Sequence, residues 1–273
     1  MKILKDTADL VRERLGDELE TLSLERLVVG LFFTGVKLSN GAGGICYTPV
    51  KDIPKAVCCP SSAGRIFNPE EIRGMPVTKA LEGLTSGEPV KTSTAIAVLN
   101  ALSLTCWEKN PPKGYTLLEG RDAQELVNMP KEKSVAVVGA FVPTLHALKA
   151  RGGTWWVVEQ DPATLMAEEM SHYVAAEESM ETIGKADVLV ITGVTLINHT
   201  LEGILDAAKP GAEIAVMGPT ASALPEPLFD RGVRVVGGVM VKDADPLLDV
   251  ISSGGSGYHF LGRYAEMMTA VRD

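Results

Sequence analysis

The spacing of apolar and polar residues changes near residue 130, which predicts two differently built parts. Upstream, Val28 to Leu38 and Ile45 to Val50 are runs of strand-forming residues, separated by the glycine-rich loop Ser39 to Gly44. This arrangement predicts two paired strands. Apolar residues at helical spacing predict helices over residues 1–20, 70–86 and 90–110. A helix, a small antiparallel sheet and further helices make an α+β domain, which we predict over residues 1–129.

Downstream, short apolar runs alternate with helical segments. Most of the runs show no polar alternation, as expected of parallel strands that are covered on both faces. We predict strands at Val135–Gly139, Thr154–Glu159, Val188–Thr192, Glu213–Met217 and Val233–Val239, with crossover helices over 143–151, 162–175, 199–210 and 225–232. The pattern predicts an α/β fold, in which a Rossmann-like, doubly wound parallel sheet over residues 130–273 follows the smaller α+β domain.

Composition and charge limit the function classes. The chain has 273 residues and 45% hydrophobic content, enough for a substantial core. Its 26 Lys and Arg residues against 35 Asp and Glu give a net charge of −9, whereas a nucleic-acid partner needs a basic face. No apolar run reaches the length of a membrane span, and the charged N-terminus does not resemble a signal peptide. We therefore expect a cytoplasmic protein that meets no membrane or nucleic acid and binds a small molecule; a homo-oligomer stays open.

The first candidate site follows the first parallel strand, because open α/β sheets bind ligands at the carboxyl ends of their strands. The turn reads Gly139-Ala140-Phe141-Val142-Pro143, with Phe141 in place of the second glycine of G-x-G-x-x-G. That ring would obstruct a pyrophosphate, so the sequence disfavours NAD and FAD. Pro143 suits the first turn of a helix, whose remaining free amides can face an anion. A plain strand-to-helix turn is the alternative.

Glu159 is the last residue of the second predicted strand, twenty residues after Gly139. An acidic side chain at this point commonly binds the hydroxyl pair of a ribose. We therefore take Glu159 as the candidate residue for holding the ligand or for acid/base chemistry. Two alternatives stay open: Glu159 is simply the first polar residue after a buried run, or Asp161 faces the ligand instead.

Two further strand ends offer polar groups. Thr195 and Asn198 follow one strand, and Gly218-Pro219 follows the next. Thr195 and Asn198 supply donors and acceptors for a polar ligand, although Asn198 is equally well suited to cap the following helix.

In the N-terminal domain, the loop around Asn40 lacks the G-x-x-x-x-G-K-[ST] pattern of nucleotide triphosphate hydrolysis. If this loop folds onto the edge of the sheet, Asn40 and Tyr47 complete a pocket between the domains.

The cysteines Cys46, Cys58, Cys59 and Cys106 show neither a disulfide framework nor the C-x-x-C spacing of a metal site. We interpret them as small, mostly apolar side chains, and soft-metal binding is the alternative. The sequence does not identify a metal or a cofactor.

An ordered set of motifs covers nearly the whole chain: FTGVKLSNGAGGICYTP, LNALS, VVGAFVP, VVEQDP, TGVTLINHT, and GPTASALPEPLF followed by GVRVVGG. With these motifs in this order, the chain resembles the heavy-metal chelation family, formerly a domain of unknown function. The resemblance implies a first domain like the N-terminal domain of enolase and a Rossmann-like second domain with partial likeness to methyltransferases. It does not imply enolase activity, because the metal-bearing barrel of enolase is absent.

The resemblance also implies a role in heavy-metal chelation, through making or modifying a small chelator such as a pterin-like or siderophore-like compound. The residues that match its motifs are Asn40, Gly139, Phe141, Pro143, Glu159, Thr195, Asn198, Gly218 and Pro219. The leading hypothesis is a protein that binds a small polar or heterocyclic molecule between the domains; whether it is an enzyme stays open. A non-catalytic protein that binds a metal or metal chelate is one alternative. A divergent methyltransferase-like enzyme is another, against which GAFVP, in place of a glycine-rich turn, argues.

Overall fold

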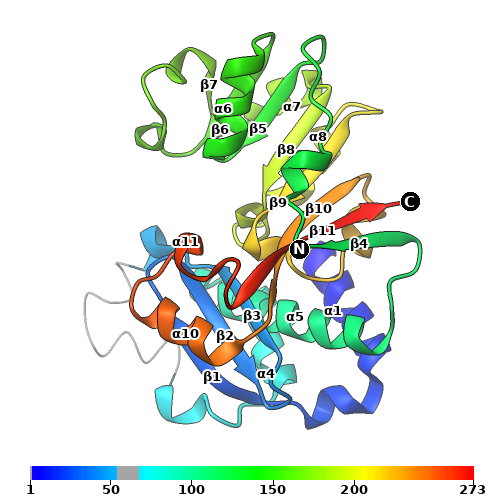
Figure 1. Ribbon diagram of the computed structural model, residues 1–273, viewed down its shortest axis with the longest axis vertical. Helices are drawn as coiled ribbons and strands as arrows, with labels where there is room; N and C mark the ends of the chain where they lie inside the picture. The colour runs from blue at the N-terminus through cyan, green and yellow to red at the C-terminus, as the bar shows by residue number, and fades with distance from the viewer. Residues whose placement is uncertain (1, 54–67) are drawn as a thin grey trace.

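The computed structural model describes residues 2–53 and 68–273, which form two sheets with helices packed around them (Figure 1). The strands are β1 (Leu24–Val29), β2 (Phe33–Leu38), β3 (Gly43–Tyr47), β4 (Tyr115–Glu119), β5 (Val135–Val138), β6 (Trp155–Glu159), β7 (Tyr173–Ala175), β8 (Val188–Thr192), β9 (Glu213–Met217), β10 (Val235–Val241) and β11 (Ala265–Arg272). The α-helices are α1 (Lys2–Leu15), α4 (Val77–Leu81), α5 (Pro89–Lys109), α6 (Val142–Arg151), α7 (Ser179–Lys185), α8 (Leu201–Ala207), α9 (Glu226–Phe229), α10 (Ala244–Ser252) and α11 (Gly257–Phe260). Within the described ranges, no helix has the length and apolar character needed to cross a bilayer.

The smaller sheet has three antiparallel strands in the order β1-β2-β3, with helices on both faces (Figure 1). On one face, α5 packs against β2 and β3. The approach is so close that a Cβ atom on Gly44 would lie 2.1 Å from the carbonyl oxygen of Ala97. On the other face, α10 packs against β1 and β2, with Ile45, Leu248 and Ile251 in one apolar cluster. The C-terminal part of the chain thus completes the core of the N-terminal sheet.

The single strand predicted over 28–38 is wrong, because a turn divides it into β1 and β2. Gly30 donates its N–H to the carbonyl oxygen of Phe33 across this turn (3.0 Å). A Cβ atom on Gly30 would lie 2.6 Å from Ile251, so only a glycine fits between the turn and α10. This tertiary contact is not visible in the run of apolar residues. The next strand, β3, begins and ends earlier than the predicted Ile45–Val50.

The larger sheet has eight strands in the order β4-β11-β10-β9-β8-β5-β6-β7. The strands from β10 through β7 in this order pair in parallel, and β11 pairs antiparallel with both β10 and β4. Every residue of β5 and of β10 is buried, as expected of strands covered on both faces. The predicted α/β class with a mostly parallel sheet is confirmed, and the last predicted strand, Val233–Val239, is β10 with its bounds moved.

The boundary predicted after residue 129 stays a prediction. Elements on each side of it cross to the other sheet: β4 pairs with β11 in the large sheet, and α10 packs on the small one.

No α-helix forms over 162–175, where a crossover helix was predicted. Two 3₁₀ turns and the short strand β7 take its place. The buried carboxylate of Glu169 lies 3.0 Å from Nζ of Lys149 on α6. His172 stacks on Trp155 with ring centroids 3.6 Å apart, and its Nδ1 lies 3.0 Å from the carbonyl oxygen of the same residue. These long-range contacts fix an irregular shape that residue spacing cannot predict.

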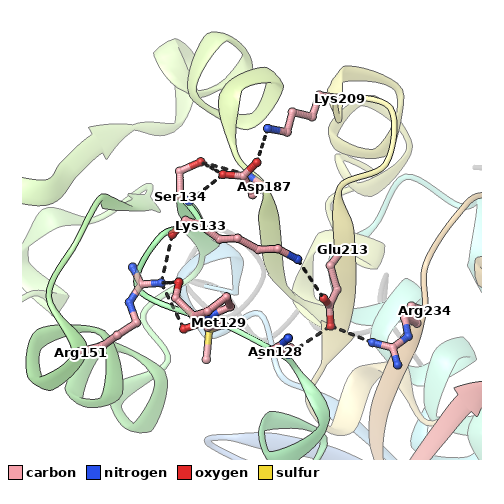
Figure 2. A network of polar contacts seen from close by, with 10 residues as sticks. Asn128, Met129, Lys133, Ser134, Arg151, Asp187, Lys209, Glu213 and Arg234 are labelled. Carbon is pink, nitrogen blue, oxygen red and sulfur yellow. Dashed lines mark hydrogen bonds and ion pairs between the residues drawn. The ribbon is translucent and has the colours of Figure 1, made fainter.

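The amino edge of the parallel sheet, where the strands begin, is held by the polar network in Figure 2. Just before β5, the hydroxyl of Ser134 donates to Asp187 (2.7 Å), and Lys209 pairs with the same carboxylate. These hydrogen bonds, with Lys209 first, hold the pKa of Asp187 well below its usual range. At the start of β9, Glu213 pairs with Arg234 (2.9 Å). The network anchors the segment that leads into β5.

Candidate functional site

The candidate site is the edge formed by the carboxyl ends of β5, β6, β8 and β9, which we call the carboxyl edge. The chain passes from β5 to β6 on one side and returns to β8 on the other, so the strand order reverses between β5 and β8. In open α/β sheets, ligands bind outside this reversal. Gly139 and Gly193 directly follow β5 and β8, Glu159 is the last residue of β6, and Gly218 directly follows β9.

The turn after β5 is tight and closely packed. Gly139 has a φ of +97°, a left-handed conformation that suits glycine, and donates its N–H to the carbonyl oxygen of Val158 (2.9 Å). A Cβ atom there would lie 3.0 Å from the methyl group of Thr192. Phe141 is half-buried and packs against the core of the sheet, whereas Pro143 is exposed in the first turn of α6. The contacts of Phe141 are those of a packing residue.

Glu159 uses its carboxylate to hold backbone amides. Oε2 accepts a hydrogen bond from the N–H of Ala140 (3.1 Å), and Oε1 accepts from the N–H groups of Gln160 (2.8 Å) and Asp161 (3.2 Å). Three donors occupy most of the acceptor capacity of one carboxylate. The side chain therefore ties the end of β6 to the turn after β5, and its acid/base role stays a prediction.

Thr195 and Asn198 lie further along the segment after β8 and bond locally. Thr195 is buried, and its hydroxyl donates to the carbonyl oxygen of Thr192 (2.6 Å). Asn198 is exposed, and its Oδ1 accepts from the backbone N–H (3.2 Å) and the hydroxyl (2.7 Å) of Thr200. Because Thr200 is the residue that precedes α8, the interpretation of Asn198 as the helix cap is wrong by two positions.

The turn after β9 joins the two sheets. Gly218, with a φ of +114°, donates its N–H to β10 (3.0 Å), and the carbonyl oxygen of Pro219 accepts from Nδ2 of Asn100 in α5 (3.2 Å). The hydroxyl of Thr220 accepts from the backbone N–H of Tyr47, at the end of β3 (3.2 Å). The N-terminal sheet thus meets the carboxyl edge at this turn, which we call the junction.

Asn40 does not lie at the junction with Tyr47. It precedes β3, whereas Tyr47 ends this strand, and five extended residues span roughly 16 Å. The side-chain amide of Asn40 donates to the hydroxyl of Thr105 in α5 (3.0 Å), and its Oδ1 accepts from the N–H of Ala42 (3.2 Å). These bonds fix the turn between β2 and β3 on α5.

Two residues near the junction, Lys51 and Asn100, were not predicted from the sequence. Lys51, in the 3₁₀ helix η2 (Val50–Asp52), forms a hydrogen-bonded ion pair with Asp161, which follows β6. The hydrogen bond between them raises the pKa of Lys51 and lowers that of Asp161. Asn100 is buried in α5, and its side-chain amide donates to the carbonyl oxygens of Ile45 in β3 and of Pro219 after β9. The signals in the sequence are modest: one amide inside the apolar run AIAVLNALSL, and one basic residue soon after a strand.

The thiols that the structure describes are poor metal ligands. Burial raises the pKa of Cys46 to about 12 and the pKa of Cys106 to about 11. Both stay protonated at neutral pH, whereas the thiolate is the form that binds metals. Cys58 and Cys59 lie outside the described residues. Over residues 2–53 and 68–273, no three His, Cys, Asp or Glu side chains gather in a way that could hold a metal ion.

Two cavities open away from the carboxyl edge. One, of about 640 Å³, lies between the end of α5, β4 and β10, and its lining includes Trp107, Leu117 and Met240. The other, of about 550 Å³, lies beside β1 and α4. These cavities compete with the carboxyl edge as places where a small molecule can bind.

Two family models match the chain, and both carry the description "Putative heavy-metal chelation". One matches residues 122–270, more than half of the chain, and the other matches residues 12–103. The chain belongs to this family. An uncharacterised protein of Methanocaldococcus jannaschii is 31% identical over 177 residues, which are 63% of this chain and 63% of that protein. The predicted family resemblance is confirmed.

Two solved structures of this family share the fold over nearly the whole chain. A protein of unknown function from Pyrococcus horikoshii superposes with a TM-score of 0.74 at 20% identity, over 98% of both chains. A protein of unknown function from Desulfitobacterium hafniense DCB-2 superposes with a TM-score of 0.71 at 19% identity, over 98% of this chain and 99% of that one. At this level of identity the likeness shows the fold alone.

Proposed function

We propose that this protein binds a small polar molecule at the carboxyl edge, beside the junction, and that this molecule is a chelator of metal ions. Membership of the heavy-metal chelation family supports the general role. The observation that carries the proposal is that residues from the N-terminal part of the chain reach the carboxyl edge on both sides of the reversal. Tyr47 bonds to Thr220, which follows β9, and Lys51 pairs with Asp161, which follows β6. Ligand sites form preferentially where two structural units meet and at such reversal points.

A bare metal ion is the less favoured ligand. The described thiols are buried and protonated, and the described carboxylates and imidazoles form no group of three. A metal that arrives within an organic chelator needs no ligands from the protein, which then recognises the chelator itself. The alternative of direct metal sequestration is therefore second.

A ribose-bearing cofactor, as a methyltransferase-like or nicotinamide enzyme would use, is also less favoured. The acidic residue after the second strand binds ribose hydroxyls through free carboxylate oxygens. In this chain those oxygens of Glu159 already accept three backbone N–H groups.

Native mass spectrometry of gently purified protein tests the proposal. We expect one small molecule with oxygen or nitrogen donor atoms to be retained, and calorimetry to show that it rebinds saturably. Chemical change of this molecule during incubation would identify an enzyme. Tight calorimetric binding of Ni²⁺ or Zn²⁺ to the bare protein would support sequestration instead. Saturable binding of S-adenosylmethionine or NAD would overturn the proposal.

A further inference from the structure

Four side chains at the carboxyl edge accept hydrogen bonds from the protein itself. At the end of β6, Glu159 accepts three backbone N–H groups, and two residues later Oδ1 of Asp161 accepts a further one (3.0 Å). At the end of β8, the hydroxyl of Thr192 accepts from the backbone N–H of Val194 (3.3 Å). After β9, the hydroxyl of Thr220 accepts from Tyr47 (3.2 Å). These four side chains therefore have less acceptor capacity left for a ligand that presents N–H or O–H donors.

Lys51 supplies the opposite kind of group. Its side chain is 66% exposed, and its ammonium carries three N–H donors, of which Asp161 takes one. Lys51 lies shortly after β3 and its ion-pair partner Asp161 shortly after β6, so the ammonium lies between the ends of these two strands. An exposed lysine–carboxylate pair contributes little to stability, and the four-carbon stem of lysine is flexible. The ammonium can therefore bond a ligand while it keeps or exchanges its contact with Asp161.

We infer that Lys51 anchors the ligand of the junction, and that this ligand is an oxygen-rich anion of the carboxylate or catecholate class. The inference rests on the proposed function and names the class of molecule that it left open. Such molecules present acceptor oxygens and negative charge, which match the free donors of Lys51 and need no acceptor from Glu159 or Thr220. The same oxygens bind metal ions, so the class agrees with the role proposed for the family.

Two probes that differ by one carboxylate test the inference. At neutral pH 2,3-dihydroxybenzoate is an anion and catechol is neutral. Calorimetry should give the anion at least about tenfold higher affinity for the wild-type protein, since hydrogen bonds between charged groups are the stronger ones. Lys51→Gln should remove most of that advantage and leave catechol unchanged, and Lys51→Arg should retain it. Asp161→Asn should tighten the anion, because it frees a donor of Lys51 and still caps the following turn.

Lys185→Gln is the matched control. Lys185 is 61% exposed and also pairs with a glutamate, but it ends α7, whose C-terminus leads to the amino edge of the sheet. Its replacement should not change either affinity. All variants alter exposed side chains, and thermal unfolding should confirm that each one folds.

Hydrogen exchange of peptides covering residues 45–52 and 139–144 locates the bound probe independently of charge. Protection in both peptides, together with loss of the anion's advantage in Lys51→Gln, supports the inference. If the probe protects both peptides equally in the wild-type protein, in Lys51→Gln and in Asp161→Asn, the inference is overturned and the proposed function is kept. No saturable binding of either probe up to about 10 mM, a very weak affinity, overturns the inference alone. Protection only in peptides away from the carboxyl edge overturns both the inference and the proposed function.

Discussion

Replacing Glu159 with glutamine should loosen the carboxyl edge even without a ligand. The carboxylate accepts three backbone N–H groups at 2.8, 3.1 and 3.2 Å. Glutamine has nearly the same shape but carries one oxygen and one NH₂ group, so at least one backbone donor then faces another donor. A hydrogen bond to a charged group contributes about 1.5–3 kcal/mol, and an unsatisfied buried donor costs about 1–3 kcal/mol. Because the side chain is only half-buried, we expect the free energy of unfolding to fall by about 1.5 kcal/mol.

Urea denaturation measures this change, and hydrogen exchange should show faster exchange at the amides of Ala140, Gln160 and Asp161. Glu168→Gln is the control, because the side chain of Glu168 is 81% exposed and its carboxylate lies as far as 3.9 Å from Nζ of Lys149. It should change the free energy of unfolding by less than about 0.5 kcal/mol. If Glu159→Gln is as stable as this control, with unchanged exchange at the three amides, the carboxylate does not hold the edge. The acid/base role would then be the better interpretation of Glu159.

Three other predictions concern the framework of the site. Gly44→Ala puts a Cβ atom 2.1 Å from a backbone oxygen of α5 and should lower the free energy of unfolding, measured by urea denaturation, by at least about 3 kcal/mol. The control Gly203→Ala, which has open space around it in α8, should raise this free energy by up to about 1 kcal/mol. Equal effects of the two substitutions would contradict the close packing of α5 on β3. The folded-state pKa of Asp187 is depressed, so its contribution is present above the unfolded pKa of about 4 and is lost as the pH falls below it. The stability difference between wild type and Asp187→Asn should therefore shrink from pH 7 to pH 3, and a difference independent of pH would contradict this. Iodoacetamide at about pH 8 should leave Cys46 and Cys106 unlabelled in the folded protein and label them in urea, as read by peptide mass spectrometry; native labelling would refute their high pKa values.

The parallel strands are predictable from sequence because they are buried on both faces, so runs such as those of β5 and β9 contain almost no polar residue. The strands at the margins carry no such pattern. β7 has three half-buried residues, and β11 has exposed Glu266 and Met267 beside buried positions. Neither shows the continuous apolar run of the central strands, and their pairing depends on the strands that they join.

The candidate site is predictable in position but not in contacts. Gly139, Glu159 and Gly218 lie at the carboxyl edge because strands of one parallel sheet end on the same side. The donors that occupy Glu159 are backbone amides, which every residue carries, so no pattern of side chains reveals them. Lys51 meets Asp161, 110 residues away, only because the two sheets pack together, and such a contact leaves no periodic trace in the sequence.

A crystal structure of the protein with 2,3-dihydroxybenzoate tests the central claim most directly. We predict the carboxylate of the probe within hydrogen-bond distance of Nζ of Lys51, beside the turn that follows β5. Electron density for the probe only in the cavity of about 640 Å³ lined by Trp107, Leu117 and Met240, with the carboxyl edge unchanged, would contradict the account.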